Sequence, residues 1–211
     1  MSNTFQRIDV AQWKRKIHCQ IFKKAVQPHY CIAFELDVTN FTSYIKDMNC
    51  SFTFAFIYSV AKCANELDEF KCRFVGDDVV LYESVDTTFT YLDKDTELFK
   101  VVTVPMQESL GDYVRLARTT AENQKEYFPG PVRDDVFIFS ALPWITFTNV
   151  SHTYFGDGEK AQPVFDWGKY SEKDGKVLLP FSVQVHHSFV DGIHIGRLAT
   201  NLQNYLDALG R

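Results

Sequence analysis

The sequence lacks both an excess of basic charge and a long apolar run. Its 22 Lys and Arg against 27 Asp and Glu leave a formal net charge of −5, so we expect no broad attraction for nucleic acid. No stretch reaches the roughly 18 uninterrupted apolar residues of a membrane span, and the first residues hold no apolar segment of a secretion signal. We therefore expect a cytoplasmic protein without nucleic-acid or membrane partners.

Cysteine is scarce and scattered. The cysteines are odd in number and include no CxxC pair, which argues against a disulfide framework and against a zinc cluster: Cys19, Cys31, Cys50, Cys63 and Cys72. We expect them to be free thiols, mostly buried in the core. Repeats, low-complexity runs and linkers rich in Pro, Gly or Ser are also missing, so residues 1–211 are expected to form a single domain.

What the sequence does contain is apolar material, 45% of its residues, enough for the packed core of one domain. Apolar periodicity predicts helices over 52–70 and 109–127, and a last helix whose inner face carries Ile195, Leu198, Leu202, Tyr205 and Leu209. Strands are expected at 34–38, 88–92, 135–150 and 176–187, with a hairpin over 72–83. This irregular interleaving predicts an α/β fold with a mixed, mainly antiparallel sheet covered by helices.

The segment VQVHHSFVDGIHIGR, residues 183–197, contains the residues best suited to catalysis. Strand alternation places His187 on the same face as Val183 and Val185, and His186 on the opposite face. An imidazole held beside buried apolar groups tends to be neutral, and a neutral imidazole can accept a proton near pH 7. Taken alone, such a histidine is more often an ordinary core residue than a catalyst.

Asp191 and Gly192 follow at the junction between this strand and the last helix. Asp is a favoured helix N-cap, Gly permits a tight turn, and an Asp-Gly pair is by itself usually only a turn. The combined pattern HHxxxDG resembles the signature of an acyltransferase superfamily. That superfamily includes chloramphenicol acetyltransferases, the acyltransferase cores of 2-oxo-acid dehydrogenase complexes, and peptide-synthetase condensation domains.

Three further segments resemble the chloramphenicol acetyltransferases in the same order: FQRIDVAQWKR (5–15), SALPW (140–144) and LLPFSVQVHH (178–187). The resemblance spans essentially the whole chain. A dehydrogenase-complex acyltransferase carries lipoyl and tethering segments that this sequence lacks, and a condensation domain is far larger. The resemblance implies a two-layer α/β sandwich that assembles as a homotrimer with active sites at subunit interfaces.

The resemblance also assigns roles to individual residues. His187 matches the catalytic general base that takes a proton from an acceptor hydroxyl, and His186 is its structural neighbour. Asp191 pairs with Arg15 and supports the backbone of the histidine. Ser140 matches the serine whose hydroxyl stabilises the oxyanion of the reaction. The alternative for SALPW is a strand corner, with Trp144 in the core.

Substrate contacts follow from the same resemblance. Lys169 and Tyr170 match residues near the phosphates and adenine of acetyl-CoA, the co-substrate, although an exposed Lys is otherwise unremarkable. The acceptor pocket, a site for a small molecule, includes Ile21, Phe22 and Tyr30, which a neighbouring subunit is expected to bring to His187. No metal is implied, because a thioester is already activated.

Two positions depart from the family pattern. Asp166 stands where the family has a threonine that helps to hold a water against the oxyanion, and it is also a candidate acceptor contact. A carboxylate there disfavours developing negative charge unless it is protonated or turned away. Phe22 stands where the family has a tyrosine in the chloramphenicol pocket, so one hydroxyl is lost.

The sequence therefore predicts a CoA-dependent O-acetyltransferase that acetylates chloramphenicol and confers resistance to the antibiotic. The two departures keep open an acetyltransferase of the same family acting on a different small-molecule hydroxyl or amine. A second alternative is a trimeric ligand-binding protein without catalysis. The joint presence of His187, Asp191, Arg15 and Ser140 argues against that second alternative, because binding alone does not need all four.

Overall fold

The structure, a computed structural model, describes residues 3–152 and 160–209. Its elements follow one another along the chain as β1 (Phe5–Arg7), α1 (Lys16–Lys23), β2 (His29–Asp37), α2 (Thr39–Asp47), α3 (Phe52–Asn65), α4 (Asp68–Lys71), β3 (Cys72–Val75), β4 (Asp78–Tyr82), β5 (Asp86–Leu92), β6 (Phe99–Val104), α5 (Leu110–Asn123), β7 (Val136–Leu142), β8 (Val164–Gly168), β9 (Ser171–Lys173), β10 (Lys176–His186) and α6 (Gly192–Ala208). None of the described helices is long and apolar enough to cross a membrane.

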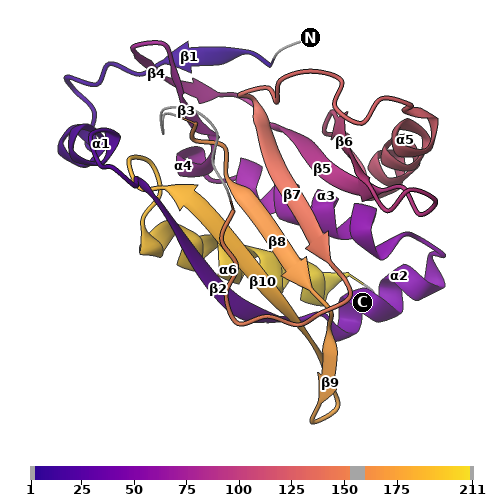
Figure 1. The fold of residues 1–211 in the computed structure, drawn as a ribbon. Coiled ribbons are helices and arrows are strands. Elements are labelled where there is room, and N and C mark those ends of the chain that lie inside the picture. The colour runs from indigo at the N-terminus through magenta and orange to yellow at the C-terminus, as the bar shows by residue number, and fades with distance from the viewer. Residues whose placement is uncertain (1–2, 153–159, 210–211) are drawn as a thin grey trace.

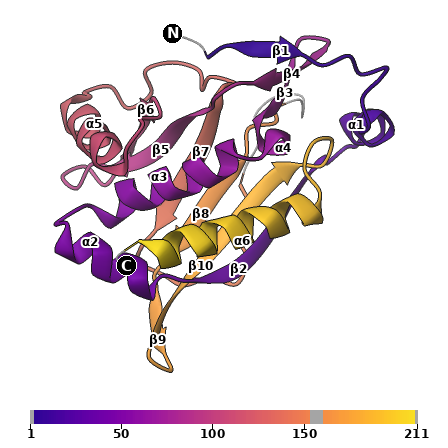
Figure 2. The ribbon, with the colours of Figure 1, turned by 180° about the vertical axis from the view of Figure 1, so that it is seen from behind.

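The main sheet has the strand order β2-β10-β8-β7-β5-β6, with β9 attached to β10 (Figure 1). Its pairs are antiparallel except for β5 with β7 and β7 with β8, which are parallel. Strands β1, β4 and β3 form a small separate sheet. Helices α2, α3 and α6 lie over one face of the main sheet (Figure 2). The predicted fold, a mixed and mainly antiparallel sheet covered by helices, is confirmed.

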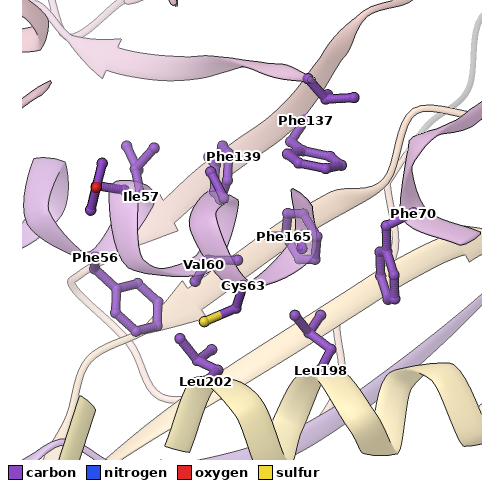
Figure 3. Close-up of a cluster of buried hydrophobic side chains, with 14 of the residues drawn as sticks. Phe56, Ile57, Val60, Cys63, Phe70, Phe137, Phe139, Phe165, Leu198 and Leu202 are labelled. Atoms are coloured by element: carbon purple, nitrogen blue, oxygen red, sulfur yellow. The ribbon is translucent and has the colours of Figure 1, made fainter. Parts of the chain in front are cut away.

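The core lies between this sheet and its helices. Helix α3 is apolar on almost every side, and ten of its residues are buried. Figure 3 shows Phe56 and Val60 of this helix among side chains from the sheet, such as Phe165, and from α6, such as Leu198 and Leu202. Each such side chain contributes about 1.5–3 kcal/mol when it is fully buried. This core fixes the sheet on which the candidate site is built.

Several predicted elements differ in extent from those observed. The helix expected over 52–70 is two helices, because α3 ends at Asn65 and α4 begins at Asp68. The strand expected over 135–150 ends at Leu142, where Pro143, which has no N–H for the ladder, begins a turn. The hairpin of β3 and β4 is confirmed, and Gly76 at its turn has a positive φ of 58°.

The face of the sheet opposite the helices carries a polar row. Strand pairing places Ser140 of β7 beside Asp166 of β8, and Asp166 beside Ser182 of β10. Residues paired in this way point to the same face. Their chain neighbours Phe139 and Phe165 face the helices instead, where they contact each other at 5.2 Å between ring centroids. The row therefore crosses three central strands on the helix-free side of the sheet.

Candidate active site

His187 lies immediately after the end of β10, one residue outside the strand that was expected to include it. Its side chain is 35% exposed and is therefore not part of the buried core. Because the strand ends at His186, the alternation of strand faces does not apply to His187. Its ring stacks on Phe22 at 3.9 Å between centroids and contacts Tyr30 at 4.6 Å. Its backbone N–H donates to the Pro28 carbonyl over 2.9 Å. The candidate base is thus held against two aromatic rings with one edge accessible.

The two aromatic neighbours come from the N-terminal part of the same chain. Tyr30 is paired with Val185 in the β2–β10 ladder, so its ring lies beside the end of β10. Its hydroxyl donates to the Val190 carbonyl over 3.2 Å, and burial raises the pKa of Tyr30 to about 12. Phe22 is on α1, next to the exposed Ile21. Both rings therefore contact His187 within one chain, and the approach of this region from a neighbouring subunit stays a prediction.

Arg15 and Asp191 form the predicted ion pair across 176 positions of sequence. Arg15 Nη1 donates to Asp191 Oδ2 over 2.5 Å, and Nη2 donates to Oδ1 over 3.0 Å. The same guanidinium donates to the carbonyls of His187 and Ser188, each over 3.3 Å. Its hydrogen bonds hold the pKa of the Asp191 carboxyl below its usual range. One buried arginine therefore fixes the backbone turn that carries His187.

The carboxylate of Asp191 also faces the imidazole ring. Asp191 Oδ1 is 3.1 Å from His187 Nδ1, but the two atoms are not aligned as a hydrogen bond. His187 Nδ1 is buried and has no hydrogen-bond partner among the described residues. Since Nδ1 is enclosed in this way, Nε2 is the ring nitrogen left to meet a substrate.

Asp191 caps α6, as predicted, and His194 completes the cap. His194 Nδ1 accepts the Asp191 N–H over 2.8 Å, while burial lowers the pKa of His194 and so favours the neutral acceptor. The spacing of three residues after the N-cap is that of a capping box, which is the signal that identifies His194. Gly192 is not needed for a tight turn, because its φ is not positive and an added Cβ meets nothing within 4 Å.

His186 lies on the opposite face of β10, as predicted. It is buried, and its Nδ1 accepts the backbone N–H of Ser188 over 3.1 Å. Its ring contacts those of His29 and Phe74. His186 therefore packs in the interior and hydrogen-bonds the backbone of the 187–191 turn.

Ser140 is two residues before the end of β7, and no other described residue hydrogen-bonds its hydroxyl. The structure does not bring it to His187 of the same chain. Ser182, in the same polar row, is five residues before His187, which corresponds to about 16 Å along a strand. Trp144, after the turn, is 64% exposed, so the alternative of a core tryptophan is wrong.

Asp166 is fully buried within the polar row, away from the Phe22 and Tyr30 rings. One of its oxygens is hydrogen-bonded to His152 Nε2, and the other accepts from the Ser182 hydroxyl over 3.4 Å. The hydrogen bond between His152 and Asp166, together with the charge of the Asp166 carboxylate, raises the pKa of His152. No pattern in the sequence indicates His152, because nothing local shows that the segment after β7 returns over the sheet.

Lys169 and Tyr170 follow β8 and border a groove of about 360 Å³. The groove is also lined by Phe52 and Thr53, the first residues of α3, together with Pro143, Trp167 and Gly168. The N-terminus of α3, the positive end of its dipole, therefore lines the same groove as Lys169. Gly168 is required here, because an added Cβ would lie 2.7 Å from the Ile145 carbonyl oxygen, which accepts the N–H of Lys169.

Comparisons with known proteins show which family this chain matches in sequence and in fold. The family described as "Chloramphenicol acetyltransferase" matches residues 3–203. The chain is 31% identical to a chloramphenicol acetyltransferase of Klebsiella sp., covering 96% of this chain and 94% of that protein. It is 27% identical to chloramphenicol acetyltransferase 2 of Haemophilus influenzae, covering 96% and 97%. A solved chloramphenicol acetyltransferase superposes with a TM-score of 0.87 at 24% identity, covering 96% of this chain and all of that one. The chain therefore belongs to the chloramphenicol acetyltransferase family, a family of acyltransferase enzymes.

Proposed function

We propose that this protein transfers the acetyl group of acetyl-CoA to a hydroxyl of chloramphenicol, with His187 as the general base. The observation that carries the proposal is the fixed imidazole, which stacks on Phe22 while Arg15 and Asp191 hold its backbone, in a chain of this family. An imidazole with one accessible nitrogen in a rigid frame is suited to proton transfer.

The residues divide the work of one acyl transfer. His187 Nε2 takes the hydroxyl proton while the acceptor oxygen forms a bond to the acetyl carbonyl carbon. The carbon–sulfur bond then breaks, and the imidazolium returns the proton to the leaving thiolate. Ser140 donates its free hydroxyl to the carbonyl oxygen as negative charge develops there. The Asp191 carboxylate, 3.1 Å from Nδ1, stabilises the imidazolium that forms in between.

In a homotrimer, the general base His187 and the oxyanion donor Ser140 can come close together from two different subunits. Ser182, the residue of β10 in line with Ser140, is about 16 Å along the chain from His187, so Ser140 and His187 of one chain are too far apart to act on one carbonyl group. In a closed ring of three, each interface can pair His187 of one subunit with Ser140 of the next. Light scattering tests this arrangement, with an expected mass of about three times the 24.4 kDa chain. A monomer that retains full activity would contradict it.

The groove at Lys169 and Tyr170 is our proposed acetyl-CoA site. Phosphate groups suit the N-terminus of α3 together with a lysine ammonium group, and Tyr170 offers an aromatic face for adenine.

We place the reaction in the cytoplasm, where the five free cysteines of this chain remain reduced.

A second candidate function is acetyl transfer to a different small-molecule hydroxyl or amine. The specific observation that favours it is Phe22, which covers the His187 ring without offering a hydroxyl to a polar acceptor. Asp166 does not add to this candidate, because it is fully buried and already hydrogen-bonded.

The experiment that tests both candidates is a thiol-release assay with acetyl-CoA and a panel of acceptors that includes chloramphenicol. The matched control is His18→Ala, because His18 is exposed on α1. The proposal is supported if chloramphenicol causes thiol release in wild type and in His18→Ala but not in His187→Ala. Release only with other hydroxyl or amine acceptors supports the second candidate. Binding of chloramphenicol without any release would show a ligand-binding protein instead.

A further inference from the structure

The polar row on the helix-free face places a carboxylate beside the proposed oxyanion donor. Asp166 is paired with Ser140 in the β7–β8 ladder, and neighbouring strands are about 4.8 Å apart. The Asp166 side chain is fully buried, so water does not screen its charge. A bare carboxylate at this position opposes the negative charge that acyl transfer places near the Ser140 hydroxyl.

His152 is held against this carboxylate by a built set of contacts. Its Nε2 is hydrogen-bonded to Asp166 Oδ1, and its backbone N–H donates to the Gln184 side-chain oxygen over 3.2 Å. The chain thus leaves the sheet after Leu142, at the end of β7, and returns at His152 to the face that carries Ser140. The imidazole is 31% exposed, so it can exchange protons with solvent while it stays attached to Asp166.

The side chains of the described strands that border this pair carry no charge. From β10 the neighbours are the uncharged side chains of Ser182 and Gln184, and from β7 the hydroxyl of Ser140. From β2 the Cys31 thiol contacts Ser182 Oγ over 3.2 Å, and burial raises the pKa of that thiol, which keeps it neutral. In the part of the chain that the structure describes, His152 is the basic side chain paired with Asp166.

We propose that His152 supplies the positive charge that neutralises Asp166, and that this pair is what allows Ser140 to stabilise an oxyanion beside a buried carboxylate. His152 is a positioning residue in this role, because it acts through Asp166 and not on the substrate. The inference rests on the proposed acetyl transfer. It gives the protein a charge pair where the family has a neutral threonine.

The pair makes catalysis depend on pH in a specific direction. Asp166 raises the pKa of His152, so the imidazolium survives to a higher pH than that of an ordinary histidine. Above that pH the pair carries a net negative charge and the oxyanion is disfavoured. The rate is therefore expected to fall at alkaline pH as His152 loses its proton.

The test compares kcat across pH for wild type, His152→Gln, Asp166→Asn and the double variant, with acetyl-CoA and chloramphenicol. Gln keeps an N–H donor and removes the charge, so His152→Gln is expected to lower kcat at pH 7 by about 10- to 100-fold with little change in either KM. Asp166→Asn removes the need for a counter-charge. The double variant is therefore expected to match Asp166→Asn, and the alkaline fall in rate is expected to vanish in both.

Two further variants keep the test decisive. Asp166→Thr restores the family's residue type and replaces Asp166→Asn if the latter does not fold. Ser182→Ala removes the other hydrogen bond of Asp166 without changing the charge of the pair, so the alkaline fall is expected to persist.

An NMR titration of the His152 ring provides a readout that does not depend on turnover, and its midpoint is expected at lower pH in Asp166→Asn. The inference is overturned if the His152 midpoint is the same in wild type and Asp166→Asn. It is also overturned if wild type is active and His152→Gln has the same rate and the same pH profile. A wild type that releases no thiol with any acceptor instead overturns the proposed function, and the role of the pair in it.

Discussion

Replacing Arg15 is the perturbation with the most sharply defined expectation. Its guanidinium forms four hydrogen bonds, two to the Asp191 carboxylate and two to the carbonyls of His187 and Ser188. Methionine keeps most of the length and apolar volume of the arginine and removes every one of these donors. In Arg15→Met the Asp191 carboxylate and both carbonyls lose their partner at the base of the candidate site.

The magnitude follows from how far the pair is buried. Breaking a buried ion pair by removing one member costs about 3–5 kcal/mol, whereas an exposed pair is worth about 0.2–1 kcal/mol. The Arg15 side chain is 7% exposed and that of Asp191 is 28% exposed, so water relieves part of the charge left behind. We therefore expect Arg15→Met to lower the free energy of unfolding by about 2–3 kcal/mol.

The assay is a double-mutant cycle in urea at pH 7 with Arg15→Met, Asp191→Asn and both changes together. A coupling energy of about 1.5 kcal/mol or more is expected, because the two residues share two hydrogen bonds. The folded pKa of Asp191 is depressed, so its contribution is complete above the ordinary carboxyl pKa of about 4 and is lost as pH falls through the lower folded value. A coupling energy near zero at pH 7, or one that grows on acidification, would refute the reasoning.

Three other predictions concern single side chains. His187→Ala is expected to lower kcat by about 100- to 10,000-fold with nearly unchanged acetyl-CoA affinity, whereas His186→Ala acts mainly on folding; steady-state kinetics and circular dichroism separate the two. Gly168→Ala is expected to cost about 1–3 kcal/mol in urea unfolding and to weaken acetyl-CoA binding, since its Cβ would lie 2.7 Å from a carbonyl oxygen; wild-type values for both would contradict the need for glycine. The raised pKa of His152 contributes stability that is complete below about pH 6.5 and is lost as pH rises through the folded value. Unfolding curves for His152→Gln are therefore expected to lack this dependence, and an identical pH profile would contradict the pairing with Asp166.

The long periodic elements and the β3–β4 hairpin were predictable from the sequence, and several other short elements were not. The spacing of Ile195, Leu198 and Leu202 identifies α6, and all three are buried. Strand β8, VFDWG, escapes prediction because Asp166 and the glycine at its end interrupt an already short apolar run. Helices α1 and α2 escape for a different reason: both are short, so their stability comes from packing and not from their own pattern.

The candidate site was predictable only in part. Local pattern places His187 at the end of a strand and Asp191 at a helix start; the strand ends one residue before His187, and Asp191 is the N-cap of α6. The contact of Asp191 with Arg15 was available only from the family resemblance, because no local rule joins residues 176 positions apart. His152 was missed altogether, since its role depends on where a long irregular segment returns to the sheet.

The pairing of β2 with β10 constrains the order in which this protein can fold during its synthesis. Strand β2 has β10 as its neighbour in the described sheet, so residues 29–37 have no strand to pair with until residues 176–186 have been made. Arg15 likewise cannot form its ion pair until Asp191 has been made, and Phe22 cannot stack until His187 has been made. Contacts between such distant segments form slowly. A ribosome that stops before residues 176–186 therefore releases a chain in which β2 has unpaired edges, and such edges pair with other chains and promote aggregation.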